Sequence, residues 1–219
     1  MMLYEKYRPK RFEDVIGQDK AVGKVKAVLS KQWGGRAWWI AGPSGTGKST
    51  LATLIANVGC ECVREMVGGE VTLGMLDEIR EEIGKRSLFA PTPNGKTPRA
   101  YIVNEAHGMR RAVIQRLDDM LERKNLPEHI VWVFTTSREG QKQLFDGQQV
   151  DAPMFLSRCL KVNLSSYGLA QAFAARAKEI AMAEGLDGKA LPAYTRLINE
   201  KHGNLRDVLD AIEMQEMMA

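Results

Sequence analysis

The chain has 219 residues, of which 44% are hydrophobic and 26% charged, and this balance excludes a disordered protein and indicates a folded globular one. The length allows one large domain, or a main domain with a small satellite. A formal net charge of +4 permits contact with a phosphate backbone but does not require it. No apolar run approaches the ~18 residues that span a bilayer, and residues 1–6 lack the apolar core of a signal peptide. We therefore expect a cytoplasmic protein, bacterial, archaeal or phage-encoded in a host cytoplasm, with no membrane partner.

The three cysteines indicate a reducing compartment. Cys60 and Cys62 are separated by one residue and Cys159 is distant, which matches neither a disulfide framework nor a zinc-binding spacing. We expect reduced thiols, mostly in the core.

Residues 1–18 are predicted to form an extended arm, because they are too polar and too rich in turn formers for a helix. Its apolar members are expected to pack on the main domain; they are Tyr7, Phe12, Val15 and Ile16. An arm that carries aromatic residues beside arginine is well suited to cover a purine, and the candidates are Tyr7, Arg8 and Pro9. The alternative is a loosely docked terminus.

The most informative segment is a G-x-x-x-x-G-K-[ST] pattern, made of Gly42, Pro43, Ser44, Gly45, Thr46, Gly47, Lys48 and Ser49. A helix is predicted over 19–33, a buried strand over 37–41 and a helix over 48–58, which together are the context of a phosphate-binding loop. Glycines allow successive N–H groups to turn inward around a di- or triphosphate. Lys48 would reach the β- and γ-phosphates, and the Ser49 hydroxyl suits Mg²⁺.

Two further predicted strands end in polar side chains. A strand over 61–67 and a helix over 71–86 are followed by a proline-rich loop over 90–99. The strand over 100–103 then runs into Asn104 and Glu105, and the strand over 130–134 runs into Thr135, Thr136 and Ser137. Ligands bind at the carboxyl ends of parallel strands, so both strands should deliver polar groups to one place.

The rest of the chain is helical apart from one short strand over 160–164. A helix over 109–123 carries arginines among acidic residues, and taken alone it is a solvated charged face; its basic members are Arg110, Arg111, Arg116 and Arg123. Residues 166–219 contain helical runs over 169–183, 189–200 and 205–217. We predict an α/β fold, with a parallel sheet flanked by helices over residues 1–164 and a small all-α domain over residues 165–219.

These motifs resemble the AAA+ ATPases of the sliding-clamp loader, such as the small subunits of replication factor C and the gamma subunit of bacterial DNA polymerase III. The resemblance covers nearly the whole chain. Its most specific parts are residues 5–18, which read EKYRPKRFEDVIGQ, the triplet Ser157-Arg158-Cys159, and residues 203–207, which read GNLRD. The implied fold is a P-loop AAA+ domain followed by a helical lid, here residues 165–219.

The resemblance implies ATP and Mg²⁺ as ligands. Nucleotide binding would fall to residues 7–9, to the loop 42–49 with Thr50, and to Arg206 of the lid. Lys48 and Ser49 would bind phosphate and Mg²⁺, and Glu105 would polarise the attacking water. The sensor of that water or of the γ-phosphate would be Thr136, in preference to Thr135. Arg158 would act in trans, as an arginine finger in a neighbouring subunit's site.

Two features depart from the family pattern. The acidic motif of the family normally begins with Asp, and Asn104 stands there instead. An amide keeps an acceptor oxygen but loses the charge that holds Mg²⁺, usually through water, so we predict weaker Mg²⁺ binding and slower hydrolysis. The chain also stops at Ala219, before the helical collar of clamp-loader subunits, which indicates either a shortened piece or assembly through the ATPase domains alone. Without the family's cysteine cluster, no structural zinc is expected.

Two functions of different classes remain open. In the first, the chain is an ATP-driven subunit that joins other clamp-loader subunits to place a sliding clamp on primer-template DNA. The arginine-bearing helix would then contact the DNA backbone without sequence preference, through Arg110, Arg111 and Arg116. In the second, it is a nucleotide-gated scaffold that binds ATP and barely hydrolyses it. A branch-migration motor, a related AAA+ enzyme, is disfavoured by residues 7–9 and 157–159.

Overall fold

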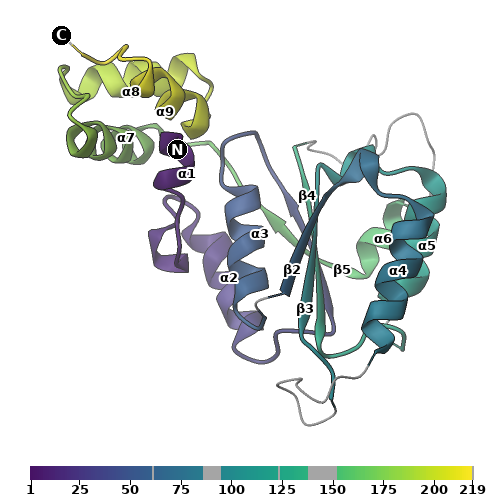
Figure 1. The fold of residues 1–219 in the computed structure, drawn as a ribbon. Helices are drawn as coiled ribbons and strands as arrows, with labels where there is room; N and C mark the ends of the chain where they lie inside the picture. Colours follow the sequence, from purple (N-terminus) through teal and green to yellow (C-terminus); the bar gives the residue numbers. More distant parts are fainter. Residues whose placement is uncertain (61, 86–94, 123, 138–151, 219) are drawn as a thin grey trace.

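A five-stranded parallel sheet forms the centre of the molecule (Figure 1). The computed structural model describes residues 1–218 except 61, 86–94, 123 and 138–151. The strands are β1 (Arg36–Ala41), β2 (Cys62–Val67), β3 (Arg99–Asn104), β4 (Ile130–Thr136) and β5 (Cys159–Asn163). Their order is β2-β3-β4-β1-β5, so β4 separates the strand that enters the phosphate loop from the strand that ends at Asn104.

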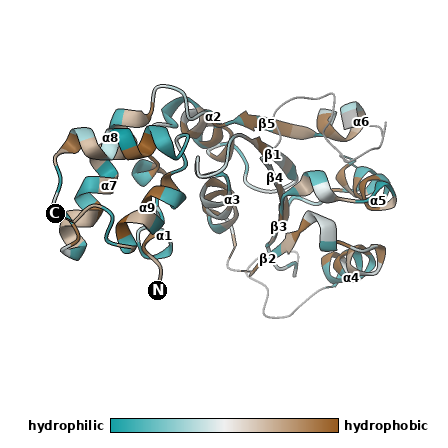
Figure 2. Ribbon diagram, turned by 90° about the horizontal axis from the view of Figure 1, so that it is seen from above, coloured by the Kyte–Doolittle hydropathy of each residue, from teal (hydrophilic) through white to brown (hydrophobic). Residues whose placement is uncertain are grey.

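Helices cover both faces of the sheet (Figure 2). They are α2 (Asp19–Leu29), α3 (Lys48–Asn57), α4 (Leu73–Gly84), α5 (Arg111–Leu121) and α6 (Ala152–Ser157). α2 and α3 pack on one face, and α4, α5 and α6 lie over the other. Successive side chains of a strand point to opposite faces. In β1, therefore, Trp38 and Ile40 enter the core under α3, and Trp39 enters the core under α5.

The lid has a core of its own. Its helices are α7 (Ala170–Glu184), α8 (Leu191–Glu200) and α9 (Leu205–Glu213). Apolar residues at helical spacing meet there, among them Phe173, Tyr194 and Ile212, each at most 3% exposed. The amino-terminal segment lies beside these helices (Figure 1).

The arm differs from its prediction in two respects. It contains the helix α1 (Leu3–Lys6), one turn long, and a 3₁₀ helix at Phe12–Asp14, so it is not extended throughout. Only Phe12 and Val15 pack against the α2–α3 core. Leu3, Tyr4, Tyr7 and Ile16 pack in the lid core instead, and Leu3 is 5% exposed. The polar composition of the arm predicted no helix, but burial of Leu3 among the lid helices stabilises α1.

The predicted fold class is confirmed, as a parallel sheet flanked by helices and followed by a helical segment, whereas the boundary at residues 164 and 165 stays a prediction. The predicted strands and helices occur with shifted ends, and α6 was not predicted. The start of the strand at Glu61, the end of the helix at Arg86, part of the loop over 90–99, and Arg123 lie outside the described residues. Within the described chain, none of the helices has the length and apolar composition of a membrane span.

Candidate nucleotide-binding site

The phosphate-binding loop joins β1 to α3 and has the backbone that its glycines permit. Gly45 and Gly47 have φ angles of 73° and 95°, in the left-handed region that favours glycine. A Cβ added at Gly47 would meet no heavy atom within 4 Å, so open space lies in front of this turn. Lys48 begins α3, is 7% exposed, and donates a hydrogen bond from Nζ to the carbonyl oxygen of Pro43 at 2.8 Å. The open turn at a helix N-terminus forms an anion cradle.

A cavity in front of this loop is bordered by the arm and the lid. The predicted residues that line it are Tyr7, Arg8, Pro9, Ser44, Gly45, Thr46, Gly47, Lys48, Ser49, Thr50, Glu105 and Arg206. Gly42, Pro43, Asn104, Thr136 and Arg158 are not part of its lining. The lining also includes Tyr4 and Arg176, which sequence reasoning missed. Neither belongs to a recognisable motif. Each is found only once the arm is seen against the lid helices, where Tyr4 lies beside Arg206 of α9 and Arg176 is on α7.

The ends of β3 and β4 meet beside Ser49, as predicted from the strand ends. The side-chain oxygen of Asn104 accepts hydrogen bonds from Ser49 Oγ at 3.3 Å and from Thr135 Oγ1 at 3.0 Å. The Asn104 amide nitrogen donates to Glu65 Oε2 at 3.3 Å. Glu65 was not among the predicted site residues, because a lone acidic residue within a strand carries no signal of its own.

Glu105 follows Asn104 and lies in a left-handed backbone conformation with φ of 49°. Its Oε2 atom accepts hydrogen bonds from the hydroxyl of Ser137 at 2.8 Å and from the backbone N–H of Ser137 at 3.3 Å. His107 Nδ1 lies 3.3 Å from the same oxygen and 3.1 Å from Thr136 Oγ1. Thr136 is fully buried and hydrogen bonds with His107, while Thr135 is the threonine that contacts Asn104. Alternation along β4 places these two hydroxyls on opposite faces of the sheet.

Comparison with solved structures identifies the fold. The RuvB Holliday junction branch migration motor of Thermotoga maritima aligns with a TM-score of 0.70 and 20% identity, over 94% of this chain and 64% of that one. The chain has the AAA+ P-loop fold. At this level of identity the likeness concerns the fold alone. No family model matches the chain.

Sequence comparison finds subunits of DNA polymerase III. The tau subunit of Bacillus subtilis is 27% identical over 233 residues, which cover 96% of this chain and 38% of that protein. The gamma subunit of Buchnera aphidicola from Acyrthosiphon pisum is 26% identical over 231 residues, covering 97% of this chain and 60% of that protein. The chain thus spans less than two thirds of the length of these relatives.

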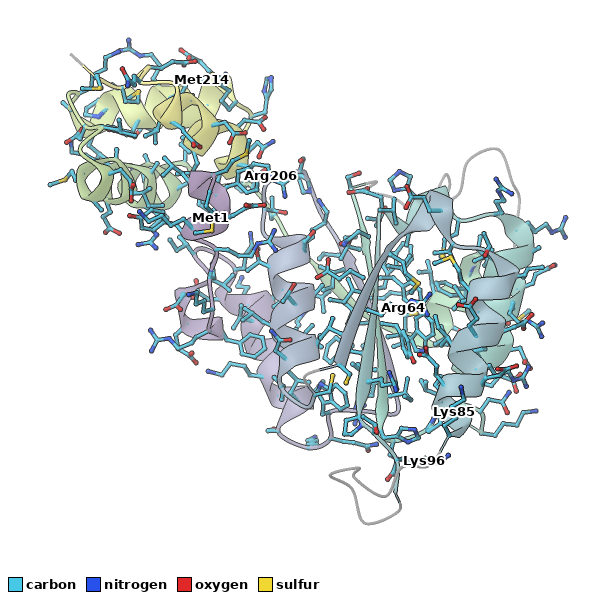
Figure 3. The ribbon with its side chains drawn as sticks, viewed as in Figure 1. Met1, Arg64, Lys85, Lys96, Arg206 and Met214 are labelled. Carbon is cyan, nitrogen blue, oxygen red and sulfur yellow. The ribbon has the colours of Figure 1, made fainter. Side chains whose placement is uncertain are left out.

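In this AAA+ fold the lid touches the phosphate loop through the start of α9. Asn204 caps α9 by accepting hydrogen bonds from the backbone N–H groups of Arg206 and Asp207, at 3.1 and 3.5 Å. A Cβ added at Gly45 would lie 1.9 Å from Asn204 Oδ1, so the cap rests directly against the loop. Arg206 lies at the edge of the lid that faces α3 (Figure 3). Its guanidinium carbon is 5.0 Å from the centre of the Tyr4 ring.

The arm is tied to the lid by a second cluster. Lys6 Nζ lies 2.6 Å from Glu184 Oε1, and the Tyr7 hydroxyl donates a hydrogen bond to the same oxygen. The hydrogen bonds from Lys6 and Tyr7 lower the pKa of Glu184, and the bond to Glu184 raises the pKa of Tyr7. The Arg176 guanidinium lies 5.9 Å from the Tyr7 ring centre. The arm therefore presents Tyr7 to the cavity while α7 holds it.

Arg158 lies outside this cavity, between α6 and β5. Its guanidinium is 2.6 Å from Asp118 of α5 and 3.4 Å from Glu122, the residue directly after α5, and its side chain is 21% exposed. On its own chain it thus contacts α5 and not the nucleotide cavity.

The three arginines predicted to contact DNA do not form one patch. Arg110 precedes α5 and Arg111 begins it, and both are exposed. Arg116 faces α4 and forms an ion pair with Asp77 at 2.7 Å. Only the first two present unengaged positive charge among the described residues of α5 and its cap.

Proposed function

We propose that this chain is an ATP-binding and ATP-hydrolysing clamp-loader subunit, which acts in the cytoplasm with sister subunits to place a sliding clamp on primed DNA. The DNA polymerase III gamma and tau relatives support this, as do residues 5–18 and 157–159. The observation that carries the ATP assignment is the cavity that joins the phosphate loop, Glu105, Arg206 and the arm. The replication factor C likeness adds no separate support beyond these motifs.

The donor set beside Ser49 fits Mg²⁺ brought in with a nucleotide. The Ser49 hydroxyl and the Asn104 amide oxygen, with the Glu65 carboxylate beside them, are hard oxygen groups of the kind Mg²⁺ prefers. Among the described residues, no three His, Cys, Asp or Glu side chains form a metal site by themselves. The phosphates must therefore supply further ligands, which is the usual manner of Mg²⁺ binding in ATPases. When bound, the ion neutralises charge on the phosphate oxygens.

Phosphoryl transfer depends on positioning and positive charge, and different residues of the chain have different roles in it. The loop N–H groups and Lys48 hold the phosphates, and Glu105 orients and polarises the attacking water. Thr136 acts as the sensor, through its hydrogen bond with His107. Arg206 reaches the nucleotide from the lid once it leaves the Tyr4 ring. Arg158 enters the site of a neighbouring subunit as the finger.

One second function is supported by a specific observation. Asn104 lacks the usual charge, and Glu105 Oε2 is engaged by hydrogen bonds from the hydroxyl and the backbone N–H of Ser137. A nucleotide-gated scaffold that binds ATP and hydrolyses it poorly would have these features. The two functions differ in turnover and share nucleotide binding.

Phosphate release separates them. The purified chain is assayed alone and mixed with its co-purified sister subunits, clamp and primed DNA, beside Glu105→Gln and Arg158→Ala. We expect the complete mixture to release phosphate faster than the chain alone. Glu105→Gln should lose this stimulated release and still bind nucleotide. Arg158→Ala should lower the rate of stimulated release by ~10³-fold. Lys161→Ala, an exposed change on β5, is the matched control. Binding without stimulated release in the complete mixture would instead establish the scaffold.

The DNA contact is tested on the same assembly. Arg110→Ala with Arg111→Ala should abolish DNA stimulation and reduce the salt dependence of DNA binding, because each phosphate contact releases counterions. Arg116→Ala is the matched comparison, since its charge is engaged by Asp77. If the double change leaves stimulation intact, α5 does not contact DNA.

A further inference from the structure

A carboxylate lies beside Asn104 on the neighbouring strand. In the β2–β3 pairing, Val67 is opposite Asn104 and Glu65 is opposite Ile102. Side chains alternate along a strand, so Glu65 shares a face of the sheet with Ile102 and Asn104. Ile102 is buried in the core under α3, the helix that carries Ser49. Glu65 therefore points to the side of the sheet on which the metal and the phosphates would lie.

The hydrogen bonds determine how the Asn104 amide is oriented. A carboxylate only accepts hydrogen bonds, so the amide nitrogen must face Glu65 Oε2. The amide oxygen is then directed at the hydroxyls of Ser49 and Thr135. This gives a continuous chain from Glu65 through Asn104 to Ser49. Aspartate at position 104 would instead place two carboxylates within hydrogen-bonding distance, where like charges oppose ionisation.

The neighbours of Glu65 leave its charge uncompensated by a cation. Among the described residues no basic side chain forms an ion pair with it. The adjacent Arg64 lies on the opposite face of β2 and forms ion pairs with Glu78 and Glu82 of α4. The cluster at Ser49 thus carries one negative charge from β2.

We propose that Glu65 is the carboxylate of the metal site, supplying from β2 the negative charge that position 104 does not carry. This rests on the proposed nucleotide function and names a further residue of that site. Mg²⁺ keeps several of its waters, so a carboxylate that acts through water and through Asn104 contributes without direct ligation. The negative charge that the family carries at position 104 is then provided by Glu65 instead. The weakening of Mg²⁺ binding is therefore smaller than expected from the loss of the charge at position 104 alone.

The test measures metal binding without turnover. Binding of a non-hydrolysable ATP analogue is titrated with Mg²⁺, and direct binding of Mn²⁺ is followed by electron paramagnetic resonance, for the parent chain, Glu65→Gln, Asn104→Asp and the double variant. We expect Glu65→Gln to raise the metal midpoint about tenfold, the range for residues that support metal ligands. In the double variant, Asn104→Asp should bring the metal midpoint back toward that of the parent chain. Introduced alone, Asn104→Asp should lower the midpoint by a smaller factor, because the two carboxylates substitute for each other. Glu81→Gln, an exposed change on α4, is the control.

Three results would overturn the proposal. The first is a Glu65→Gln midpoint equal to that of Glu81→Gln. The second is an equal loss of analogue binding in Glu65→Gln with and without metal, together with a lower melting temperature, which would mean a structural role. The third is a double variant no better than Glu65→Gln. If one of these results is obtained while the parent chain binds metal and analogue, only the role of Glu65 is overturned and the proposed function stands. If the parent chain binds neither metal nor analogue, the role of Glu65 and the proposed function are both overturned.

Discussion

The contact between Gly45 and the lid makes a prediction that can be tested without nucleotide. Alanine at Gly45 or at Gly47 must adopt a left-handed backbone, which costs about 1–2 kcal/mol in either position. The two sites differ in their surroundings. A Cβ at position 47 meets nothing within 4 Å, whereas a Cβ at position 45 lies 1.9 Å from Oδ1, 2.6 Å from Cγ and 2.7 Å from Cα of Asn204. Only Gly45→Ala must therefore displace the cap of α9.

The cost of that displacement can be stated. Loss of an asparagine cap costs about 1 kcal/mol. For a chain of this length, each kcal/mol lowers the melting temperature by about 2–4 °C. Gly47→Ala should therefore melt about 2–8 °C below the parent, and Gly45→Ala a further 2–4 °C or so lower. Thermal unfolding of the nucleotide-free proteins, followed by circular dichroism, measures both.

A second variant isolates the cap. Asn204→Gly removes two of the three atoms nearest the added Cβ, and glycine at a cap costs only a few tenths of a kcal/mol. In the double variant with Gly45→Ala, the loss should be smaller than the sum of the single losses. Equal melting temperatures for Gly45→Ala and Gly47→Ala, with additive losses in the double variant, would refute the contact between loop and lid.

Two further predictions concern ion pairs. Hydrogen bonding to Lys6 holds the pKa of Glu184 below its ordinary 4.5, so this contact stabilises the fold above that pH and is lost as the pH falls through the lowered value. The melting-temperature difference between the parent and Glu184→Gln should accordingly shrink between pH 7 and pH 3, and a constant difference would exclude the link. Asp118→Asn should destabilise the chain by about 1–3 kcal/mol in urea unfolding, because Arg158 loses its nearest carboxylate at 2.6 Å. Glu122→Gln, which removes the partner at 3.4 Å, should have a smaller effect, and the reverse order would contradict this assignment.

The sheet and the phosphate loop were predictable because their signals are local. A parallel strand covered on both faces is apolar throughout, as in Trp38–Ile40 and Val131–Phe134. The loop adopts backbone angles that residues other than glycine rarely adopt, so the spacing of its glycines identifies the turn. The strand-end rule also predicted that polar groups from both strand ends would meet, and Thr135, near the end of β4, does contact Asn104.

Contacts that depend on distant parts of the chain were not predictable. Leu3 donates its backbone N–H to Glu213 Oε2 at 3.2 Å, across 210 positions of sequence, and no local pattern indicates such a partner. Helix α6 has six residues and includes Pro153, which is tolerated in a first turn, so it is too short to show a helical period. The ion pairs of Arg158 likewise join α5 to the segment before β5.

Asn104 shows why a motif departure is not enough to judge a site. Considered alone, asparagine at position 104 lacks the negative charge of aspartate and predicts weaker metal binding. Read in the sheet, it is one member of a group in which Glu65 contributes the charge and Asn104 connects it to Ser49. In the proposed metal site, the summed charge near Ser49 would act on Mg²⁺, and parallel pairing allows either β2 or β3 to supply that charge. The register that brings Glu65 to this place is set by how β2 and β3 pair, which a single sequence does not reveal.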